Sequence, residues 1–165
     1  MVYFREVQQF RQPWLWAILL APMLLCGYGL YRQLVLGRPW GNHPLPSQGL
    51  LVVNALVLLM LGWLYAVRLV TEVREDELRV HFVLLWRSKK FPWRDIRSFR
   101  AVTYRPLADY GGWGIRRGLQ GWAYNVSGNR GVEIELTNGE RVLVGSQRPE
   151  ELARAIEERA GPVPA

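Results

Sequence analysis

The chain has 165 residues, 50% of them hydrophobic and 21% charged, and a formal net charge of +7. Its single cysteine, Cys26, excludes an intramolecular disulfide and a thiolate metal cluster. The positive charge favours an anionic partner, either a membrane surface or a nucleic acid. Most long aliphatic runs precede Arg68, which leaves one modest soluble domain after them.

Residues 1–12 (MVYFREVQQFRQ) are expected to form a cytoplasmic segment ahead of the first apolar run. The spacing of Tyr3, Val7 and Phe10 allows a short amphipathic helix on the membrane interface. A disordered start is the alternative that these residues leave open.

Two uncharged apolar runs predict a transmembrane helical hairpin. The first run covers residues 14–31, and we place its helix at residues 13–36. The second run, residues 49–67, spans about 28 Å as a helix and nearly matches a hydrocarbon core of about 30 Å. Its helix is placed at residues 49–68, and the Gly- and Pro-rich residues 37–48 form an external loop. With the bilayer as the nearest anionic surface, we expect no nucleic acid partner.

A signal peptide is the competing interpretation of the first run, because Arg5 and Arg11 precede an apolar stretch. No small-x-small cleavage site follows the run, and the run is longer than a usual signal core. We therefore favour a retained helix.

Orientation in the membrane is predicted from the arginines near the ends of the two runs. Cytoplasmic flanks of transmembrane helices are enriched in Lys and Arg. The outer flanks carry five arginines and the side of the linking loop carries two: Arg5, Arg11, Arg68, Arg74 and Arg79 against Arg32 and Arg38. This predicts a multi-pass protein of the inner (plasma) membrane with both termini in the cytoplasm.

Asn54 is the one strongly polar side chain within the second run. In an antiparallel hairpin that pairs Tyr31 with Gly49, a residue five positions after Gly49 lies opposite a residue five positions before Tyr31. Asn54 is therefore level with Cys26. An amide that faces lipid is costly. We therefore expect a contact between the two helices at Cys26 and Asn54.

After residue 68 the apolar pattern alternates as in β-strands, and a final segment has helical spacing. The expected strands span residues 69–75, 78–86, 87–91, 97–104, 122–126, 132–136 and 141–145, and the helix spans residues 149–159. Six or seven short strands must bend into a small sandwich or half-open barrel, with the helix plugging its open end. The predicted domain covers residues 69–160, followed by a tail at 161–165.

Four short stretches carry a family resemblance: FPWRDI at residues 91–96, YGGWG at 110–114, YNVSG at 124–128 and GSQRPEEL at 145–152. Over about residues 12–160 the chain resembles bacterial pleckstrin-homology-like (PH-like) membrane proteins, in which a two-helix hairpin precedes the β domain. The resemblance implies a mainly-β PH-like half-open barrel or sandwich capped by a C-terminal α-helix. It also implies a membrane-associated interaction or scaffold role.

One feature departs from the eukaryotic PH domains that bind phosphoinositides through basic residues around the first hairpin turn. Here that turn reads Arg74-Glu75-Asp76-Glu77, which would repel a phosphorylated head group. The resemblance therefore does not extend to inositide binding at this turn.

Residue patterns that could carry catalysis have simpler structural explanations. The glycines at residues 111–114 run into Ile115-Arg116-Arg117 instead of a helix with Lys and Ser or Thr, as a phosphate loop requires. Glu133 and Glu135 share one strand face, where solvent exposure is the ordinary reason for glutamate. We expect no enzyme, no catalytic residues, no metal site and no cofactor.

The basic segment between Arg87 and Arg117 is the strongest functional signal in the soluble part. It contains nine Lys and Arg residues against Asp95 and Asp109 only. We expect its exposed members to contact the anionic cytoplasmic leaflet, with a solvated strand face as the alternative. The candidate contacts are Arg87, Lys89, Lys90, Trp113, Arg116 and Arg117.

Two functions remain open at this point. The favoured one is an integral membrane protein that presents a noncatalytic cytoplasmic PH-like module to the lipid surface or to an envelope protein. The alternative is an accessory subunit of a membrane enzyme or transporter complex. A membrane protein partner or a homo-oligomer fits either function.

Overall fold

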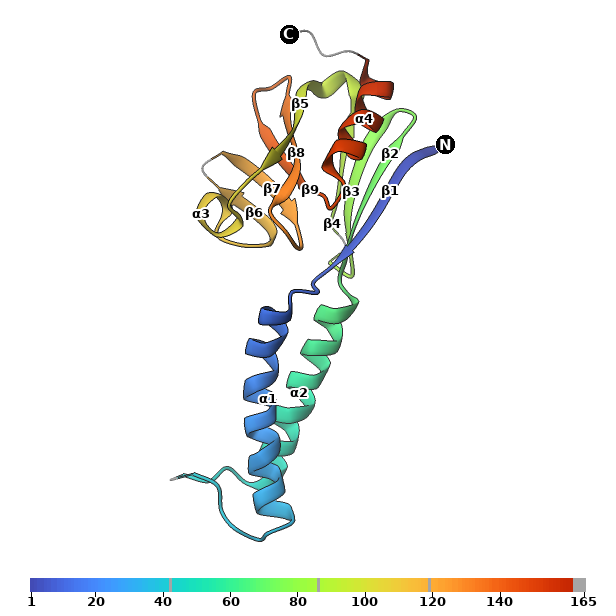
Figure 1. Ribbon diagram of the computed structural model, residues 1–165. Coiled ribbons are helices and arrows are strands. Elements are labelled where there is room, and N and C mark those ends of the chain that lie inside the picture. The colour runs from blue at the N-terminus through green and yellow to red at the C-terminus, as the bar shows by residue number, and fades with distance from the viewer. Residues whose placement is uncertain (42, 86, 119, 162–165) are drawn as a thin grey trace. The chain divides into compact units, whose positions relative to one another are not determined.

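The computed structural model describes residues 1–41, 43–85, 87–118 and 120–161 (Figure 1). Asn42 of the expected loop, Trp86 at the end of an expected strand, and residues 162–165 of the expected tail lie outside the described residues. The chain divides into two compact units. The helical unit is Arg11–Ala66, and the β unit combines Met1–Phe10 with Val67–Ala165.

The helical unit contains α1 (Pro13–Leu34) and α2 (Ser47–Ala66). Both helices are long and apolar enough to cross a membrane. Of their residues only Gly29, Leu50 and Leu61 are buried, so most of their aliphatic side chains have no protein cover in the described structure. Helices that are apolar all round are stable where lipid or another protein surrounds them.

Contacts between α1 and α2 follow the antiparallel register expected from the sequence. The hydroxyl of Ser47 donates to Gln33 Oε1 at 3.1 Å. At the other end of the pair, the rings of Trp16 and Tyr65 meet edge to face, with centroids 6.0 Å apart. The helices therefore run alongside each other over most of their length.

The N-terminal segment forms a strand, and the expected interfacial helix or disordered start is wrong. β1 (Val2–Gln9) pairs antiparallel with β2 (Arg68–Arg74). The side chains of Phe4, Glu6 and Gln8 are buried, while their sequence neighbours are more exposed. Two of the three inward residues are polar, so the sequence does not show the apolar–polar alternation of a strand. The spacing of Tyr3, Val7 and Phe10 suggests a helix instead. The helical unit is thus an insertion between two adjacent strands of one sheet.

The first sheet has the order β1-β2-β3-β4 and is antiparallel throughout, with β3 at Glu77–Val83 and β4 at Arg87–Pro92. The acidic turn predicted between residues 75 and 77 joins β2 to β3. A short 3₁₀ turn, η1 (Trp93–Asp95), then leads to the second sheet.

The second sheet has the order β5-β8-β9-β7-β6. Its strands are β5 (Ile96–Thr103), β6 (Gly114–Gly118), β7 (Gly121–Asn125), β8 (Arg130–Leu136) and β9 (Arg141–Gly145). β9 pairs antiparallel with β8 and parallel with β7, so it lies in the middle of the sheet. The Gly-rich stretch also contains a short helix, α3 (Pro106–Tyr110), and neither α3 nor β6 was predicted.

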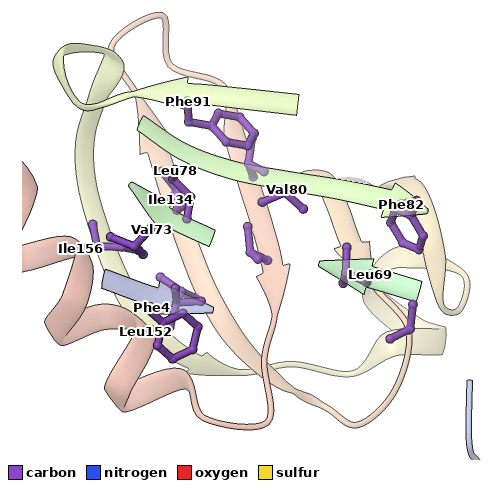
Figure 2. Close-up of a cluster of buried hydrophobic side chains, with 14 of the residues drawn as sticks. Phe4, Leu69, Val73, Leu78, Val80, Phe82, Phe91, Ile134, Leu152 and Ile156 are labelled. Atoms are coloured by element: carbon purple, nitrogen blue, oxygen red, sulfur yellow. The ribbon is translucent and has the colours of Figure 1, made fainter. Parts of the chain in front are cut away.

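The main core lies between the two sheets (Figure 2). Phe82 and Phe91 from the first sheet and Ile134 from the second are each at most 2% exposed. The C-terminal helix α4 (Pro149–Ala160) adds Leu152 and Ile156, which are fully buried. α4 contacts β1 and β2 on one side and β5 and β8 on the other, so it closes one flank of the sandwich (Figure 1).

A smaller cluster covers the opposite face of the second sheet. Tyr104, Tyr110, Ala123 and Leu143 pack there, with the rings of Tyr104 and Tyr110 edge to face at 5.9 Å. Gly118 is required on β6, because a Cβ at this position would collide with the backbone of Asp109 in α3. The chain is therefore a mainly-β structure of two sheets with α-helices, two of which have the length and composition of membrane spans.

Candidate functional site

The chain leaves and re-enters the β unit at one end of the first sheet. β1 ends at Gln9, which pairs with Arg68 at the start of β2, and Arg68 pairs with Val83 at the end of β3. Only residues 10–12 separate β1 from α1, and only Val67 separates α2 from β2. We call this end, marked by Gln9, Arg68 and Val83, the tether end.

Cross-sheet contacts extend the tether end into the second sheet. Gln8 Nε2 donates to the carbonyl of Gly145 at 2.8 Å, at the end of β9. Gly145 pairs with Gly131, just after the turn that joins β7 to β8. Trp113 Nε1 donates to the carbonyl of Gly128 in that turn, at 2.9 Å. Trp113 is thus packed on the β7–β8 turn at the tether end.

Charge differs between the two ends of the β unit. In the described parts of the turns at residues 83–87 and 126–130, the charged residues are Arg87 and Arg130, and Arg130 forms an ion pair with Glu150. Opposite them lies the far end, formed by the turns at residues 74–77, 93–96 and 137–140. It carries five acidic residues and two arginines: Glu75, Asp76, Glu77, Asp95 and Glu140 with Arg74 and Arg94.

The predicted membrane contacts do not lie together. Arg87 is exposed at the tether end, where it pairs in register with Phe82. Lys89 and Lys90 follow along β4, a sheet edge, and are also exposed. Arg116 and Arg117 lie on β6, and the Arg117 guanidinium stacks 5.9 Å from the Trp122 ring centroid.

Acidic partners neutralise other members of the basic segment. Arg100 Nη2 lies 2.6 Å from Glu133 Oε2, and Arg97 Nη1 lies 3.4 Å from Glu135 Oε1. The glutamates on β8 are thus ion-pair partners of β5. Two of the nine positive residues are therefore paired with glutamates of β8.

Glu6 connects the N-terminal strand to the C-terminal half of the chain. Its carboxylate is buried, and it accepts hydrogen bonds from Ser146 Oγ at 2.6 Å and from the Gln147 backbone N–H at 2.8 Å. Hydrogen bonds to an ionised acceptor are stronger than neutral ones. Sequence reasoning missed Glu6, because a glutamate in an otherwise polar N-terminal segment carries no signal of burial.

Arginines from α4 and the turn before it also hold β1. The Arg148 guanidinium lies 4.9 Å from the Phe4 ring centroid, and its Nη2 donates to the carbonyl of Arg5. Arg159 stacks 3.4 Å from the Tyr3 ring centroid. Such cation–π contacts stabilise by roughly 0.5–1 kcal/mol at exposed sites.

Tyr104 and Asn125 form a buried polar pair in the second sheet. Asn125 Nδ2 donates to Tyr104 Oη at 3.0 Å, and the Gly114 N–H donates to Asn125 Oδ1 at 3.0 Å. Burial raises the pKa of Tyr104 to about 12, and the hydrogen bond from Asn125 partly offsets that rise. Burial also raises the pKa of the neighbouring Tyr110, with Glu133 and Asp109 adding to the effect. A phenol that stays protonated here acts as a structural group.

In the helical unit, Asn54 lies on the side of α2 that faces α1. Its Oδ1 is 4.0 Å from the place a Cβ on Gly27 would occupy, one residue from Cys26. Its Nδ2 donates to the carbonyl of Leu50 at 2.9 Å, so the amide is satisfied within its own helix. Crosslinking of position 54 to Cys26 stays a prediction.

Two serines that could carry chemistry have structural partners. Ser146 donates to Glu6, and Ser98 Oγ lies 3.4 Å from Glu135 Oε2. A surface pocket of about 270 Å³ next to α3 contains the Arg100–Glu133 ion pair among its lining residues. Among the described residues, no group of three or more His, Cys, Asp or Glu side chains is arranged to hold a metal.

These features define a class: a mainly-β protein in which two long apolar helices are inserted between the first two strands of a sheet. The chain belongs to the DUF6141 family, a family of unknown function, whose model matches residues 1–161. The match includes β1, both apolar helices and α4. Neither a curated protein nor a solved structure matches the chain significantly.

Proposed function

We propose that this chain is an integral membrane protein that holds a noncatalytic, PH-like β module against the cytoplasmic leaflet, with both termini in the cytoplasm. The observation that carries the proposal is the insertion of α1 and α2 between β1 and β2. Strands that pair in one sheet must lie on the same side of a bilayer. Both ends of the helical unit therefore emerge on one side, as a two-helix hairpin requires.

The short links support a position close to the membrane surface. Three residues span at most about 10 Å and one residue about 3.5 Å, so two separate connections restrain the tether end. The arginine excess on the outer flanks favours a cytoplasmic position for that end. There Arg68 and Arg87 are exposed, and each contributes about 1 kcal/mol beside anionic lipid.

Two features support the PH-like assignment. A first sheet of four antiparallel strands is followed by a second sheet, and a C-terminal helix closes one flank between them. At the pocket next to α3, Arg100 and Glu133 form an ion pair with each other, which fits a structural role for these two side chains.

Cysteine labelling in intact cells tests the topology. In a Cys26→Ser background, an impermeant maleimide should label His43→Cys and should miss Arg5→Cys and Glu140→Cys. Cell lysis should make both hidden positions reactive. Labelling of position 140 before lysis would contradict the proposed orientation.

Purification in mild detergent separates the proposed function from the alternative of an accessory subunit. A module whose partner is lipid should purify as the chain alone, or as copies of itself. A stoichiometric membrane enzyme or transporter that copurifies, and is lost when the exposed face of α2 is altered, would favour the accessory role.

A further inference from the structure

The turn between β3 and β4 has a composition unlike the other turns of the β unit. Its described residues 83–85 read Val-Leu-Leu, whereas the β8–β9 turn contains Asn138-Gly139 and the β2–β3 turn contains Glu75-Asp76. Turns favour Gly, Asn, Asp and Ser, because these residues tolerate the backbone angles of a turn or hydrogen-bond to its backbone, and because they are polar or small. An apolar turn on the surface therefore requires another explanation.

Burial in the β unit does not provide that explanation. Leu85 packs against the main core, but Val83 is 36% exposed and Leu84 is 44% exposed. Leu84 has a φ of 68°, and it is the only described residue other than glycine with positive φ. The left-handed conformation is unfavourable for leucine, and Gly or Asn would adopt it more easily. Leu84 thus combines an unfavourable backbone with an exposed apolar side chain.

The position of this turn points to the bilayer as its partner. Val83 pairs with Arg68, the second residue after α2, so the turn lies at the tether end. Arg68 and Arg87 flank it, and both are exposed. Apolar side chains between arginines suit the boundary between acyl chains and anionic head groups.

We infer that the β3–β4 turn inserts Val83 and Leu84 into the cytoplasmic leaflet and forms a third membrane contact beside α1 and α2. This inference rests on the proposed membrane anchoring and adds to it a contact made by the β unit itself. Insertion of the two apolar side chains and contacts of Arg68 and Arg87 with lipid phosphates then act together. They restrain the rotation of the β unit about its two links to the helices.

Site-specific fluorescence in the full chain tests the inference. In a Cys26→Ser background, an environment-sensitive dye is attached at Leu84→Cys, at Asp76→Cys or at Leu58→Cys, and the protein is reconstituted in vesicles of phosphatidylcholine and phosphatidylglycerol. Position 76 is the matched control, because it lies at the other end of β3, about 25 Å away. Position 58 lies within α2 and reports the membrane span itself.

The expected result is a blue-shifted dye at position 84 that a lipid-borne quencher quenches roughly twofold or more strongly than the dye at position 76. If position 58 is quenched and position 84 behaves like position 76, the third contact is wrong and the anchoring stands. If position 58 is not quenched, the anchoring fails and the inference fails with it. Protection of position 84 from both lipid-borne and aqueous quenchers would show a protein partner and overturn the inference.

A second variant separates membrane contact from folding. Leu84→Asn removes the apolar side chain and places a residue that tolerates positive φ. A dye at Val83→Cys should therefore lose its lipid quenching in the Leu84→Asn background, while the thermal unfolding midpoint stays unchanged or rises. Unchanged quenching in this folded variant would contradict the role of Leu84.

Discussion

The second sheet and the N-terminal edge of the first sheet present different side chains to the space between the sheets. On β8, Val132 and Ile134 are fully buried, and their neighbours on β9 are equally apolar. At the edge of the first sheet, Glu6 and Gln8 of β1 and Thr71 of β2 point into the same interior. The second sheet is thus held by apolar packing, whereas the strand that leads to α1 is held by directed polar contacts.

This difference explains what determines the register of the N-terminal strand. Apolar packing tolerates small shifts of a strand, because the stabilisation from burying apolar surface is roughly proportional to the buried area and does not depend on direction. A buried carboxylate with two fixed donors accepts only one register. Polar contacts at β1 therefore position the connection to the helices, and apolar contacts elsewhere supply most of the stability.

Removal of β1 should have the largest effect. We expect residues 69–165 alone to lose cooperative folding, because the open edge of β2 and the buried partners of Phe4 and Glu6 become exposed. Joining Phe10 to Val67 through a short Gly/Ser linker should restore a folded, soluble β unit. Circular dichroism and urea unfolding of the two proteins check this. A cooperative transition for residues 69–165 equal to that of the joined protein would contradict it.

In the apolar half of the interior, Ile134→Ala should lower the free energy of unfolding of the joined β unit by about 3–4 kcal/mol, through lost burial and a new cavity. Glu135→Ala on the same strand faces outward and is its control, with an expected loss below about 1 kcal/mol. Chemical unfolding measures both. A similar loss for the two variants would remove the distinction between inner and outer faces.

At the polar edge, Glu6→Ala should cost about 2–3 kcal/mol, because Ser146 and the Gln147 N–H would lose a buried charged acceptor. Glu75→Ala is the control, since that side chain is exposed at the far end. Hydrogen exchange should also rise in β1 more than in β8 for the Glu6 variant. An equal rise of hydrogen exchange in β1 and in β8 would show that Glu6 does not act locally.

The Tyr104–Asn125 pair adds a pH dependence to the second sheet. With a pKa of about 12 in the folded state and about 10 when unfolded, Tyr104 contributes stability that is complete below pH 10. This contribution is lost as the pH rises from 10 to 12, because the unfolded chain releases its proton first. Over that range the loss should reach about 2 kcal/mol. Tyr104→Phe should flatten this part of the stability profile, and an identical slope in both proteins would contradict the assignment.

Thr71→Val should have the smallest effect, and it should be favourable. Thr71 is fully buried, and its hydroxyl has no hydrogen-bond partner among the described residues. A methyl group of similar size removes that cost, for a gain of about 1 kcal/mol. Urea unfolding measures the gain. A clear loss of stability would indicate that a water molecule or other group bridges Thr71.

Sequence reasoning reached most elements after residue 68, because their inward residues are apolar and their turns contain Gly, Asn or Asp. It found the strand around Ile134, the Asn138-Gly139 turn and the helix with Leu152 and Ile156. It failed where the signal depended on distant partners. β1 was missed because Glu6 and Gln8 find their partners near residue 145. In the basic segment, the ion pair of Arg100 with Glu133 could not be predicted, because it joins residues far apart in the chain.

The insertion of the helices within a β-hairpin has a consequence for biosynthesis. β1 is made first, but its partner β2 appears only after both helices have been synthesised. If only one helix crossed the bilayer, the two strands would lie on opposite sides and could not pair. Under the proposed membrane anchoring, completion of the sheet therefore depends on correct insertion of both helices. A wrongly inserted chain would keep an open edge on β2, and an open strand edge is a template for aggregation.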